Sequence, residues 1–330
     1  MKVAGIVIGL AIASLLLYLG ISQVMLAIHH PAPVRTAETP DVQTSIQSVP
    51  VEDTAASDGK KVYALPSNIF NDSYFPEQWA LQKMQGWQTR PGGSEVLVAV
   101  LDTGIDRRHE DLAGKVAKSV NFTKSTTASD AIGHGTHIAG IIAAIANNGI
   151  GIAGLAPNAR LLNVKVADDE GIVWASAAAK GIIWAVNKGA KIINMSLAIP
   201  TATPALEEAV NYAWSKGVVI IAAAGNTGTS VPTYPASFSN VIAVAATDIN
   251  DSLWEKSNHG DWVNAYAPGV EIFSTLPGNS YGYKSGTSIA TAYATAAAAL
   301  MFDTVTDANG DGFVNDEVTA ALKAAFALPH

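Results

Sequence analysis

A serine, a histidine and an aspartate lie in segments whose surroundings suit acyl transfer. Ser288 follows a Gly-Thr pair at the start of a predicted helix of small residues. A hydroxyl is a weak nucleophile until a neighbouring imidazole accepts its proton, and His134 is a candidate for that base. A carboxylate on the other side of the ring, here Asp102, would orient the imidazole and stabilise its charged form. Taken alone, Ser288 is also a suitable helix N-cap, because a serine hydroxyl can accept a hydrogen bond from a free N–H of the first turn.

Alternating strands and helices are predicted to position these residues. Near-continuous apolar runs predict strands that are buried on both faces, at residues 95–102, 159–166, 191–197 and 218–226. The stretches between them predict helices, at residues 134–147, 172–189 and 204–217. This alternation indicates right-handed βαβ crossovers and therefore an α/β fold.

Several polar residues lie where such a fold binds its ligands, beyond the carboxyl ends of the strands. Asp102, Ser196 and Asn226 each end a predicted strand, or directly follow its apolar part. His134 and Ser288 each begin a predicted helix. Any one of the five would be an ordinary cap or loop residue, but together they predict an active site. The amide of Asn226 and the backbone N–H of Ser288 would suit a developing oxyanion.

Four segments resemble the signature blocks of the subtilisin-like serine proteases: VAVLDTGIDRRHEDL, GHGTHIAG, AAAGNTG and SGTSIATA. The likeness covers residues 68–301, and it is strongest to the thermitase branch in NDSYFPEQWALQKMQGW and TYPASFSNVIAVAATD. It implies a three-layer fold with helices on both faces of a mostly parallel sheet, and a serine endopeptidase that forms an acyl-enzyme. It assigns Asp102 as the orienting acid, His134 as the base, Asn226 as the oxyanion donor and Ser288 as the nucleophile.

By the same resemblance, a polypeptide substrate would bind as an extended strand through main-chain hydrogen bonds. The expected edges are Glu170 and Gly171 on one side, and Ser196, Leu197 and Ala198 on the other. The expected wall of the P1 pocket is Ala223, Ala224 and Gly225, with Thr233 near its base. None of these pocket residues is charged, so we expect apolar or neutral P1 side chains.

Calcium is the expected metal, because the chain offers oxygen ligands and has no cysteine. The thermitase likeness implies a structural site made by side chains of Asp72, Asp111 and Asn148 and by carbonyls of Ala146, Ile150 and Ile152. The sequence DANGDGFVNDEV gives a second candidate, with Asp307, Asn309, Asp311 and Asn315 at calcium-loop positions one, three, five and nine. Its twelfth position is Val318 instead of an acid, so a plain turn is an equally suitable interpretation.

Composition excludes several other classes. The 330-residue chain has a net charge of −8, which argues against nucleic acid, because phosphate contacts need clustered Lys and Arg. GIGIAG (residues 149–154) matches a dinucleotide pattern, but it follows a predicted helix and precedes a strand, so no nucleotide is expected. His137 is predicted to be packed in the structure, and His109 and His259 to lie at the surface.

The N-terminal residues predict a membrane anchor. Residues 3–21 are apolar apart from Ser14 and glycines, and as a helix they would span about 28 Å, close to a bilayer core. Without a clear small-x-small cleavage site they favour an uncleaved transmembrane helix over a signal peptide. The flanking charges favour a domain outside the cytoplasm, or a secreted one if the segment is cleaved.

The expected organisation has four parts. Residues 1–28 form the anchor or signal, 29–64 a polar tether, 65–303 the peptidase domain, and 304–330 a tail with the calcium-like loop and an amphipathic helix. Two other functions stay open. One is an inactive relative that binds extended peptides or membrane partners. The other is an esterase on a related sheet, although the G-x-S-x-G elbow is absent.

Overall fold

The computed structural model describes residues 46–47, 52–53, 70–84, 95–302 and 304–327. The transmembrane helix expected within residues 3–21 lies outside these ranges, so the structure does not bear on it. Every helix within the ranges is too short or too polar to span a bilayer. Of the expected tether, only two short strands are described, β1 (Ile46–Gln47) and β2 (Glu52–Asp53).

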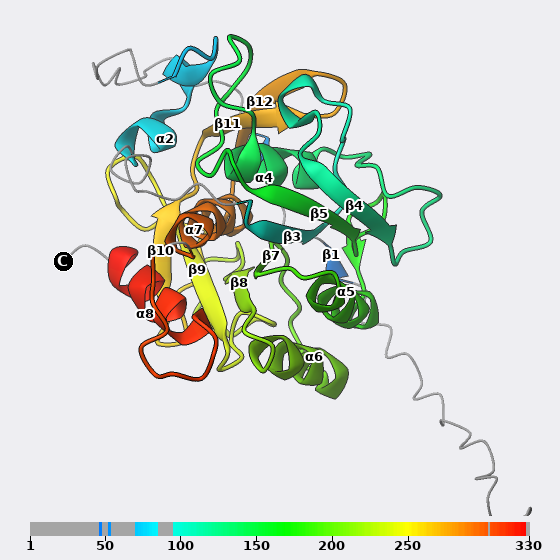
Figure 1. Ribbon diagram of the computed structural model, residues 1–330, viewed down its shortest axis with the longest axis vertical. Coiled ribbons are helices and arrows are strands. Elements are labelled where there is room, and N and C mark those ends of the chain that lie inside the picture. Colours follow the sequence, from blue (N-terminus) through cyan, green and yellow to red (C-terminus); the bar gives the residue numbers. More distant parts are fainter. Residues whose placement is uncertain (1–45, 48–51, 54–69, 85–94, 303, 328–330) are drawn as a thin grey trace, which may run out of the picture. The chain divides into compact units, whose positions relative to one another are not determined.

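A seven-stranded parallel sheet forms the centre of the described part of the chain (Figure 1). Its strands lie in the order β10-β9-β8-β7-β3-β5-β4, and all neighbouring pairs are parallel. They are β3 (Leu97–Asp102), β4 (Val116–Asn121), β5 (Arg160–Lys165), β7 (Ile192–Met195), β8 (Val219–Ala223), β9 (Val241–Thr247) and β10 (Ala265–Pro268). The predicted strands are confirmed as β3, β5, β7 and β8, although each is shorter than its apolar run.

Helices cover both faces of this sheet, as predicted. One face packs against α4 (His134–Ala143) and α7 (Thr287–Met301), and the other against α5 (Ala175–Asn187) and α6 (Pro204–Trp214). In β3, Val98 and Val100 belong to the first core, whereas Ala99 and Leu101 belong to the second. Because successive side chains of a strand point to opposite faces, both faces must be apolar, and the run appears unbroken in sequence.

The predicted helices are confirmed in type, but their ends differ. The helix predicted to reach residue 147 ends at Ala143, and Asn147 has a left-handed backbone with φ of 61°. The helix predicted from residue 172 begins at Ala175, because residues 172 and 173 form a short strand, β6 (Ile172–Val173). β6 pairs antiparallel with β1, which accounts for the extended conformation there.

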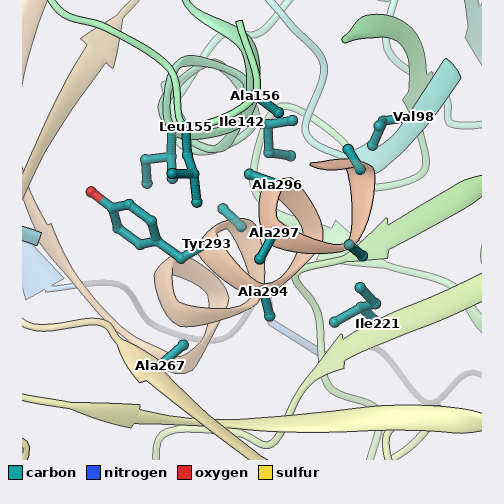
Figure 2. Packing of buried hydrophobic residues seen from close by; sticks show 14 of the residues in the cluster. Val98, Ile142, Leu155, Ala156, Ile221, Ala267, Tyr293, Ala294, Ala296 and Ala297 are labelled. Carbon is teal, nitrogen blue, oxygen red and sulfur yellow. The ribbon is translucent and has the colours of Figure 1, made fainter. Parts of the chain in front are cut away.

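Helix α7 is buried along its whole length of 15 residues. Figure 2 shows Ala294, Ala296 and Ala297 of this helix between Ile221 of β8 and Leu155 on the other side. Small side chains allow the backbone of a helix to approach its neighbours closely, and a larger side chain would overfill this core. The run of alanines is therefore a packing feature.

A hairpin, a tail helix and several short helices complete the described fold. β11 (Ile272–Leu276) and β12 (Ser280–Ser285) form an antiparallel hairpin, and β2 pairs antiparallel with the end of β12. The predicted tail helix is confirmed as α8 (Asn315–Ala325), which packs against α7 and shares its core. Short helices η1 (Phe75–Glu77), α2 (Trp79–Lys83) and η2 (Glu110–Leu112) lie earlier in the chain.

Candidate active site

The end of β3 and the start of α4 bring Asp102 and His134 together. Nδ1 of His134 donates to Oδ1 of Asp102 at 2.6 Å, and the same oxygen accepts the Thr103 N–H at 2.7 Å. The two residues are 3% and 5% exposed. A buried carboxylate at Nδ1 holds the proton on that nitrogen, so Nε2 is left with a lone pair. The pair predicted from the sequence has the geometry of an oriented base.

The close approach of these two elements depends on Gly135. A Cβ at this position would lie 2.1 Å from the Gly104 carbonyl oxygen and 3.0 Å from Cβ of Asp102. Neither backbone could make room without moving the end of β3 away from α4. A side chain at residue 135 would therefore separate the carboxylate from the imidazole.

Ser288 lies at the start of α7, but it is not the cap. The N-cap is Gly286, and Ser288 is the second residue of the helix. Its hydroxyl donates to the carbonyl of Ser196 at 3.2 Å, and the Ser196 hydroxyl donates to the carbonyl of Ser288 at 2.9 Å. The N-cap interpretation of Ser288 is therefore wrong.

Strand register places this serine pair beside Asp102. Met195 of β7 is opposite Leu101 of β3, so the next residues, Ser196 and Asp102, stand side by side at the carboxyl edge of the sheet. Ser288 is held against Ser196 and is fully buried. The structure thus gathers the predicted nucleophile and the Asp102–His134 pair at neighbouring positions of one edge.

Nε2 of His134 has no hydrogen-bond partner among the described residues, although it is buried. Buried polar atoms are nearly always paired, so such an atom needs an explanation. A base that must accept a proton during a reaction provides one. In this structure the hydroxyl of Ser288 donates to the carbonyl of Ser196 instead of to His134. Catalytic hydrogen bonds often form fully only with substrate in place.

Thr287 fixes the orientation of Asn226. Oδ1 of Asn226 accepts the N–H of Thr287 at 2.9 Å and its hydroxyl at 2.8 Å. The Thr287 hydroxyl also accepts the N–H of Gly225 at 3.0 Å. The oxygen of the Asn226 amide therefore faces Thr287, and its NH₂ group points away from Thr287. The side chain as a whole lies at the N-terminal end of α7, the end that also carries Ser288. This arrangement suits a donor for an oxyanion formed at Ser288.

The first predicted substrate edge leads into β6. Gly171 has a left-handed backbone, with φ of 80°, and it directly precedes Ile172. Val173 of β6 bridges Ala167, whose N–H donates to the Asp102 carbonyl at 3.2 Å. The loop with Glu170 and Gly171 is thereby tied to the end of β3.

This edge already carries an extended strand. Backbone pairing joins Ile46 with Val173 and Gln47 with Ile172 in antiparallel register. The paired residues of β6, Ile172 and Val173, thus lie one and two positions after the predicted Gly171. β6 is able to add a strand of the kind that an extended polypeptide would supply.

The remaining predicted substrate residues follow β7 and β8. Ser196 and Leu197 are buried, and Ala198 is half-buried. Ala223 ends β8, and the next carbonyl, of Ala224, accepts the hydroxyl of Thr233 at 2.9 Å. These contacts place the predicted pocket residues in one group.

Gly225 is required in that group. Its φ is 107°, and a Cβ there would lie 2.6 Å from Nδ2 of Asn258. Asn258 is itself fixed, since it donates to the Ala224 carbonyl at 3.0 Å. A side chain at residue 225 would therefore strain the turn and displace its neighbour.

Three polar residues that were not predicted from the sequence surround the Asp102–His134 pair. Thr103 follows Asp102, and its hydroxyl donates to the buried Asp130 at 2.8 Å. Lys165 is fully buried, and its ammonium contacts the carbonyl of Thr103 and forms an ion pair with Asp169 at 3.0 Å. That contact lowers the pKa of Asp169. The available signal was Lys165 itself, a charged residue at the carboxyl end of the apolar run of β5.

Of the other histidines that the structure describes, one was predicted wrongly and two correctly. His109 was expected at the surface but is fully buried; Nε2 is 3.0 Å from the Ser280 carbonyl, and Nδ1 accepts the N–H of Asp111. The hairpin β11–β12 covers it. His259 is exposed, as predicted. His137 is packed, as predicted, and Nε2 lies 3.1 Å from the carbonyl of Ile272.

His137 should make the folded protein sensitive to acid. Burial lowers its pKa to about 3, and the nearby charge of Lys284 adds to this effect. In the unfolded chain the pKa returns to about 6.5. Between pH 3 and pH 6.5, His137 binds a proton in the unfolded chain but not in the folded one. The free energy of unfolding therefore loses nothing to His137 above pH 6.5, and it falls as the pH drops towards 3, by at most about 5 kcal/mol.

We therefore expect His137→Gln to flatten the pH dependence of unfolding. The measurement is urea unfolding at steps from pH 4 to pH 7, for this variant and for His259→Gln. The exposed His259 supplies the matched control, which should keep the wild-type slope. Equal slopes for all three proteins would show that His137 does not carry the effect.

The first predicted metal site consists of buried carboxylates around one loop. Asp72 and Asp111 are 3% and 0% exposed. Asp72 accepts the N–H groups of Asn147 and Asn148, and Asp111 accepts the amide of Asn148 at 2.9 Å. Burial raises the pKa of the Asp111 carboxyl. A cation beside it would favour the charged form.

The rest of that predicted site is main chain. The N–H of Ile152 donates to Asp111 at 2.8 Å, and the N–H of Ile150 donates to the Asn148 side chain at 3.0 Å. The structure therefore brings the loop that contains Ala146, Ile150 and Ile152 against both acids. Among the described residues, no three acidic or histidine side chains are grouped to bind a metal. A metal here would need carbonyl and amide oxygens beside the two carboxylates, which suits a hard cation.

The tail loop is closed by its own carboxylates. Asp307 accepts the N–H groups of Gly310 and Gly312, and Glu317 accepts those of Ala308 and Asn309. Asn309 and Asp311 each accept the N–H two residues later. Asn315, predicted as the ninth-position ligand, instead begins α8 and directs its NH₂ to the Trp214 carbonyl. The structure groups the first three predicted residues but not the fourth.

Comparison with known proteins agrees with this geometry. A model described as the subtilase family (Peptidase_S8) matches residues 93–325. The chain is 46% identical over 250 residues to a thermophilic serine proteinase of Bacillus sp. (strain AK1), which covers 72% of this chain and 62% of that protein. It is 46% identical over 236 residues to thermitase of Thermoactinomyces vulgaris, a match that covers 70% of this chain and 84% of thermitase. Subtilisin BL of Lederbergia lenta is 45% identical over 210 residues, covering 63% and 77%.

Proposed function

The chain belongs to the subtilase family of serine endopeptidases, and on that premise we propose that it hydrolyses polypeptides through an acyl-enzyme on Ser288. The observation that carries this assignment is the buried 2.6 Å bond between Asp102 and His134, which leaves Nε2 without a partner. Ser288 lies at the same edge of the sheet, fixed by its bond to Ser196. These residues perform the two proton transfers that acyl transfer requires.

The reaction follows from this arrangement. Nε2 of His134 accepts the proton of the Ser288 hydroxyl as Oγ bonds to the carbonyl carbon of the substrate. The carbonyl oxygen becomes an oxyanion that accepts hydrogen bonds from the Ser288 N–H and the Asn226 amide. His134 then protonates the departing amine. Water attacks the resulting ester by the same steps, which releases the acid and restores Ser288.

We expect Asn226→Ala to lower kcat by about 10²–10³-fold, the loss known for the oxyanion asparagine of subtilisin, a relative. The KM should change little, because the oxyanion exists only in the transition state and the intermediate. The measurement is steady-state kinetics on a peptide amide. Asn240→Ala is the control, because the amide of the half-buried Asn240 donates to Asn211. An effect confined to KM would assign Asn226 to substrate binding instead.

Substrate is proposed to lie as an extended strand along β6 and the segment after β7. The antiparallel pairing of β1 with β6 supports this, because an extended strand lies on that edge and substrate would take its place. The second edge is Ser196, Leu197 and Ala198, and the P1 pocket is formed by Ala223, Ala224, Gly225 and Thr233. The uncharged pocket favours neutral or apolar P1 side chains.

A structural calcium ion is proposed at the loop between Asp72 and Asp111. Two buried carboxylates and an amide beside carbonyl-bearing main chain are the ligands that calcium prefers. Bound there, calcium would stabilise the fold without taking part in the reaction. The tail loop with Asp307, Asn309 and Asp311 is a weaker second candidate.

Calcium at 100 times its Kd should stabilise the folded chain by about 2.7 kcal/mol. For a domain of this size that corresponds to a rise of roughly 5–10 °C in Tm. Thermal unfolding of a Ser288→Ala variant, with calcium or with a chelator, measures the shift without self-digestion. Asp111→Asn should remove the shift, whereas Asp311→Asn in the tail loop should retain it. The reverse result would move the site to the tail.

The apolar segment at residues 3–21 supports a further proposal, that the chain is anchored in a membrane with its peptidase domain outside the cytoplasm. If the segment is cleaved, the domain is secreted. Membrane fractions washed at high pH should retain the full chain and lose a form without residues 1–28. Recovery of the full chain in the wash would contradict an uncleaved anchor.

A fluorophosphonate probe tests the proposed activity. It should label the wild-type protein covalently and fail to label Ser288→Ala. Absence of labelling in the folded wild type would favour the alternative of a subtilase-like protein that only binds peptides. If the wild type is labelled, cleavage of casein separates the proposed peptidase from an esterase, which would cleave only ester substrates.

A further inference from the structure

Asp130 is a buried carboxylate, 6% exposed, in the loop before α4. It accepts five hydrogen bonds. Oδ1 accepts the hydroxyl of Thr103 at 2.8 Å and the N–H groups of Ile132 and Gly133 at 3.1 and 2.9 Å. Oδ2 accepts the N–H and the hydroxyl of Thr136, at 2.8 and 2.7 Å. Both oxygens therefore act only as acceptors.

These bonds join the two elements that carry the base and its orienting acid. Thr103 is the residue directly after Asp102, and Gly133 and Thr136 lie one before and two after His134. The Thr103 hydroxyl also accepts the N–H of Gly135 at 3.0 Å. The Asp130 carboxylate and the Thr103 hydroxyl thus bond to residues on both sides of His134, and the Thr103 hydroxyl belongs to the residue next to Asp102.

The start of α4 needs such a partner. Its N-cap, Gly133, has no side chain and a left-handed backbone with φ of 83°, so it makes no side-chain cap. Asp130 and Thr103 instead accept the first-turn N–H groups of Thr136 and Gly135. A carboxylate at this end is also favoured by the helix dipole. The helix that presents His134 is therefore capped by groups that also hold the end of β3.

We propose that Asp130 is a positioning residue, which sets the hydrogen bond between Asp102 and His134 by capping α4 directly and by holding the hydroxyl of Thr103, which caps it as well. The inference rests on the proposed function, since it concerns the orientation of the proposed base. Asp130 touches neither reacting group. A displacement of about 1 Å in a catalytic group can cost about 10²-fold in rate, so a cap that fixes this geometry has a measurable effect on kcat.

Asp130→Asn tests the requirement for two accepting oxygens. The variant side chain has the same shape, but one oxygen becomes an NH₂ group that faces donors and cannot accept from them. We expect kcat to fall by about 10–10²-fold with KM little changed. Asp248→Asn is the matched control, because Asp248 also orders a loop by accepting two N–H groups, those of Asn250 and Ser252.

Substitutions of Thr103 provide a second test that leaves the other four bonds of Asp130 in place. Thr103→Val keeps the shape and removes the hydroxyl, whereas Thr103→Ser keeps the hydroxyl. We expect Thr103→Val to lower kcat about tenfold, and Thr103→Ser to retain most of the activity. This pair decides the question even if Asp130→Asn fails to fold.

The decisive readout is the proton in the bond between His134 and Asp102. Its NMR resonance lies strongly downfield for a proton in so short a bond, and it should shift or broaden in Asp130→Asn and Thr103→Val. In the same two variants, the acid limb of the plot of kcat/KM against pH should move. Asp248→Asn should alter neither. Unchanged resonance, pH profile and kcat in folded Thr103→Val and Asp130→Asn would overturn the proposal and leave Asp130 a residue for stability alone.

The two proposals fail in different ways. If the wild type is not labelled by fluorophosphonate, the proposed activity is wrong, yet the resonance still reports whether Asp130 positions His134. If the wild type is active and the resonance is insensitive to both substitutions, only the positioning role is wrong.

Discussion

Replacing Ser288 with alanine should lower kcat by about 10⁶-fold, the loss measured for the nucleophile of subtilisin, a relative of this chain. The hydroxyl supplies the oxygen that bonds to the substrate in the acyl-enzyme, and in this structure it donates to the carbonyl of Ser196. Removing it leaves the N–H of Ser288 and the amide of Asn226 in place. The remaining rate should therefore reflect binding and oxyanion stabilisation alone.

The sharpest form of this experiment combines two substitutions. His134→Ala alone should cost about as much as Ser288→Ala, and the double variant should be no slower than either, because the two groups act as a unit. Ser280→Ala, an exposed hydroxyl on β12, is the matched control and should keep full activity. Rates that fall by the product of the two single losses would show independent roles. More than one-hundredth of the activity left in Ser288→Ala would identify another nucleophile.

The sequence predicted those parts of the fold in which burial leaves a local pattern. β3 and β8 are unbroken apolar runs because both faces of the sheet are covered, and this pattern needs no knowledge of their neighbours. The end of the helix at Ala143 and the start of α5 at Ala175 depend on tertiary contacts instead. Residues 172 and 173 are extended because β1 pairs with them, which no local pattern of the helix-like stretch indicates.

The same distinction applies to the site. Asp102, His134, Asn226 and Ser288 were identified because they end strands or begin helices, and because their segments resemble a known family. His109 was misplaced because RRHED reads as a polar surface turn, and the hairpin that buries it is more than 160 residues away in sequence. Asp130 stands in a polar loop, TASDAIG, and its five bonds arise only when β3 and α4 meet.

Replacing Asp102 with asparagine should lower kcat by about 10⁴-fold near neutral pH. Oδ1 of Asp102 accepts the proton on Nδ1 of His134 at 2.6 Å and the N–H of Thr103 at 2.7 Å. The new amide can take two orientations. In the first, its oxygen accepts the Thr103 N–H; in the second, its NH₂ group faces His134 and donates to Nδ1. In the second case the ring carries its proton on Nε2 and cannot accept one from Ser288. In either case the negative charge that stabilised the imidazolium is gone.

Asp106→Asn is the matched control for this substitution. Asp106 is 7% exposed, lies four residues later, and accepts the N–H groups of Arg108 and Gly278. Its loss should affect Tm more than kcat. The measurement is kcat against pH for both variants, because Asp102→Asn should recover part of its activity in alkaline solution, where hydroxide can replace the base. A loss of less than tenfold would mean that the hydrogen bond, without the charge, is sufficient to orient His134.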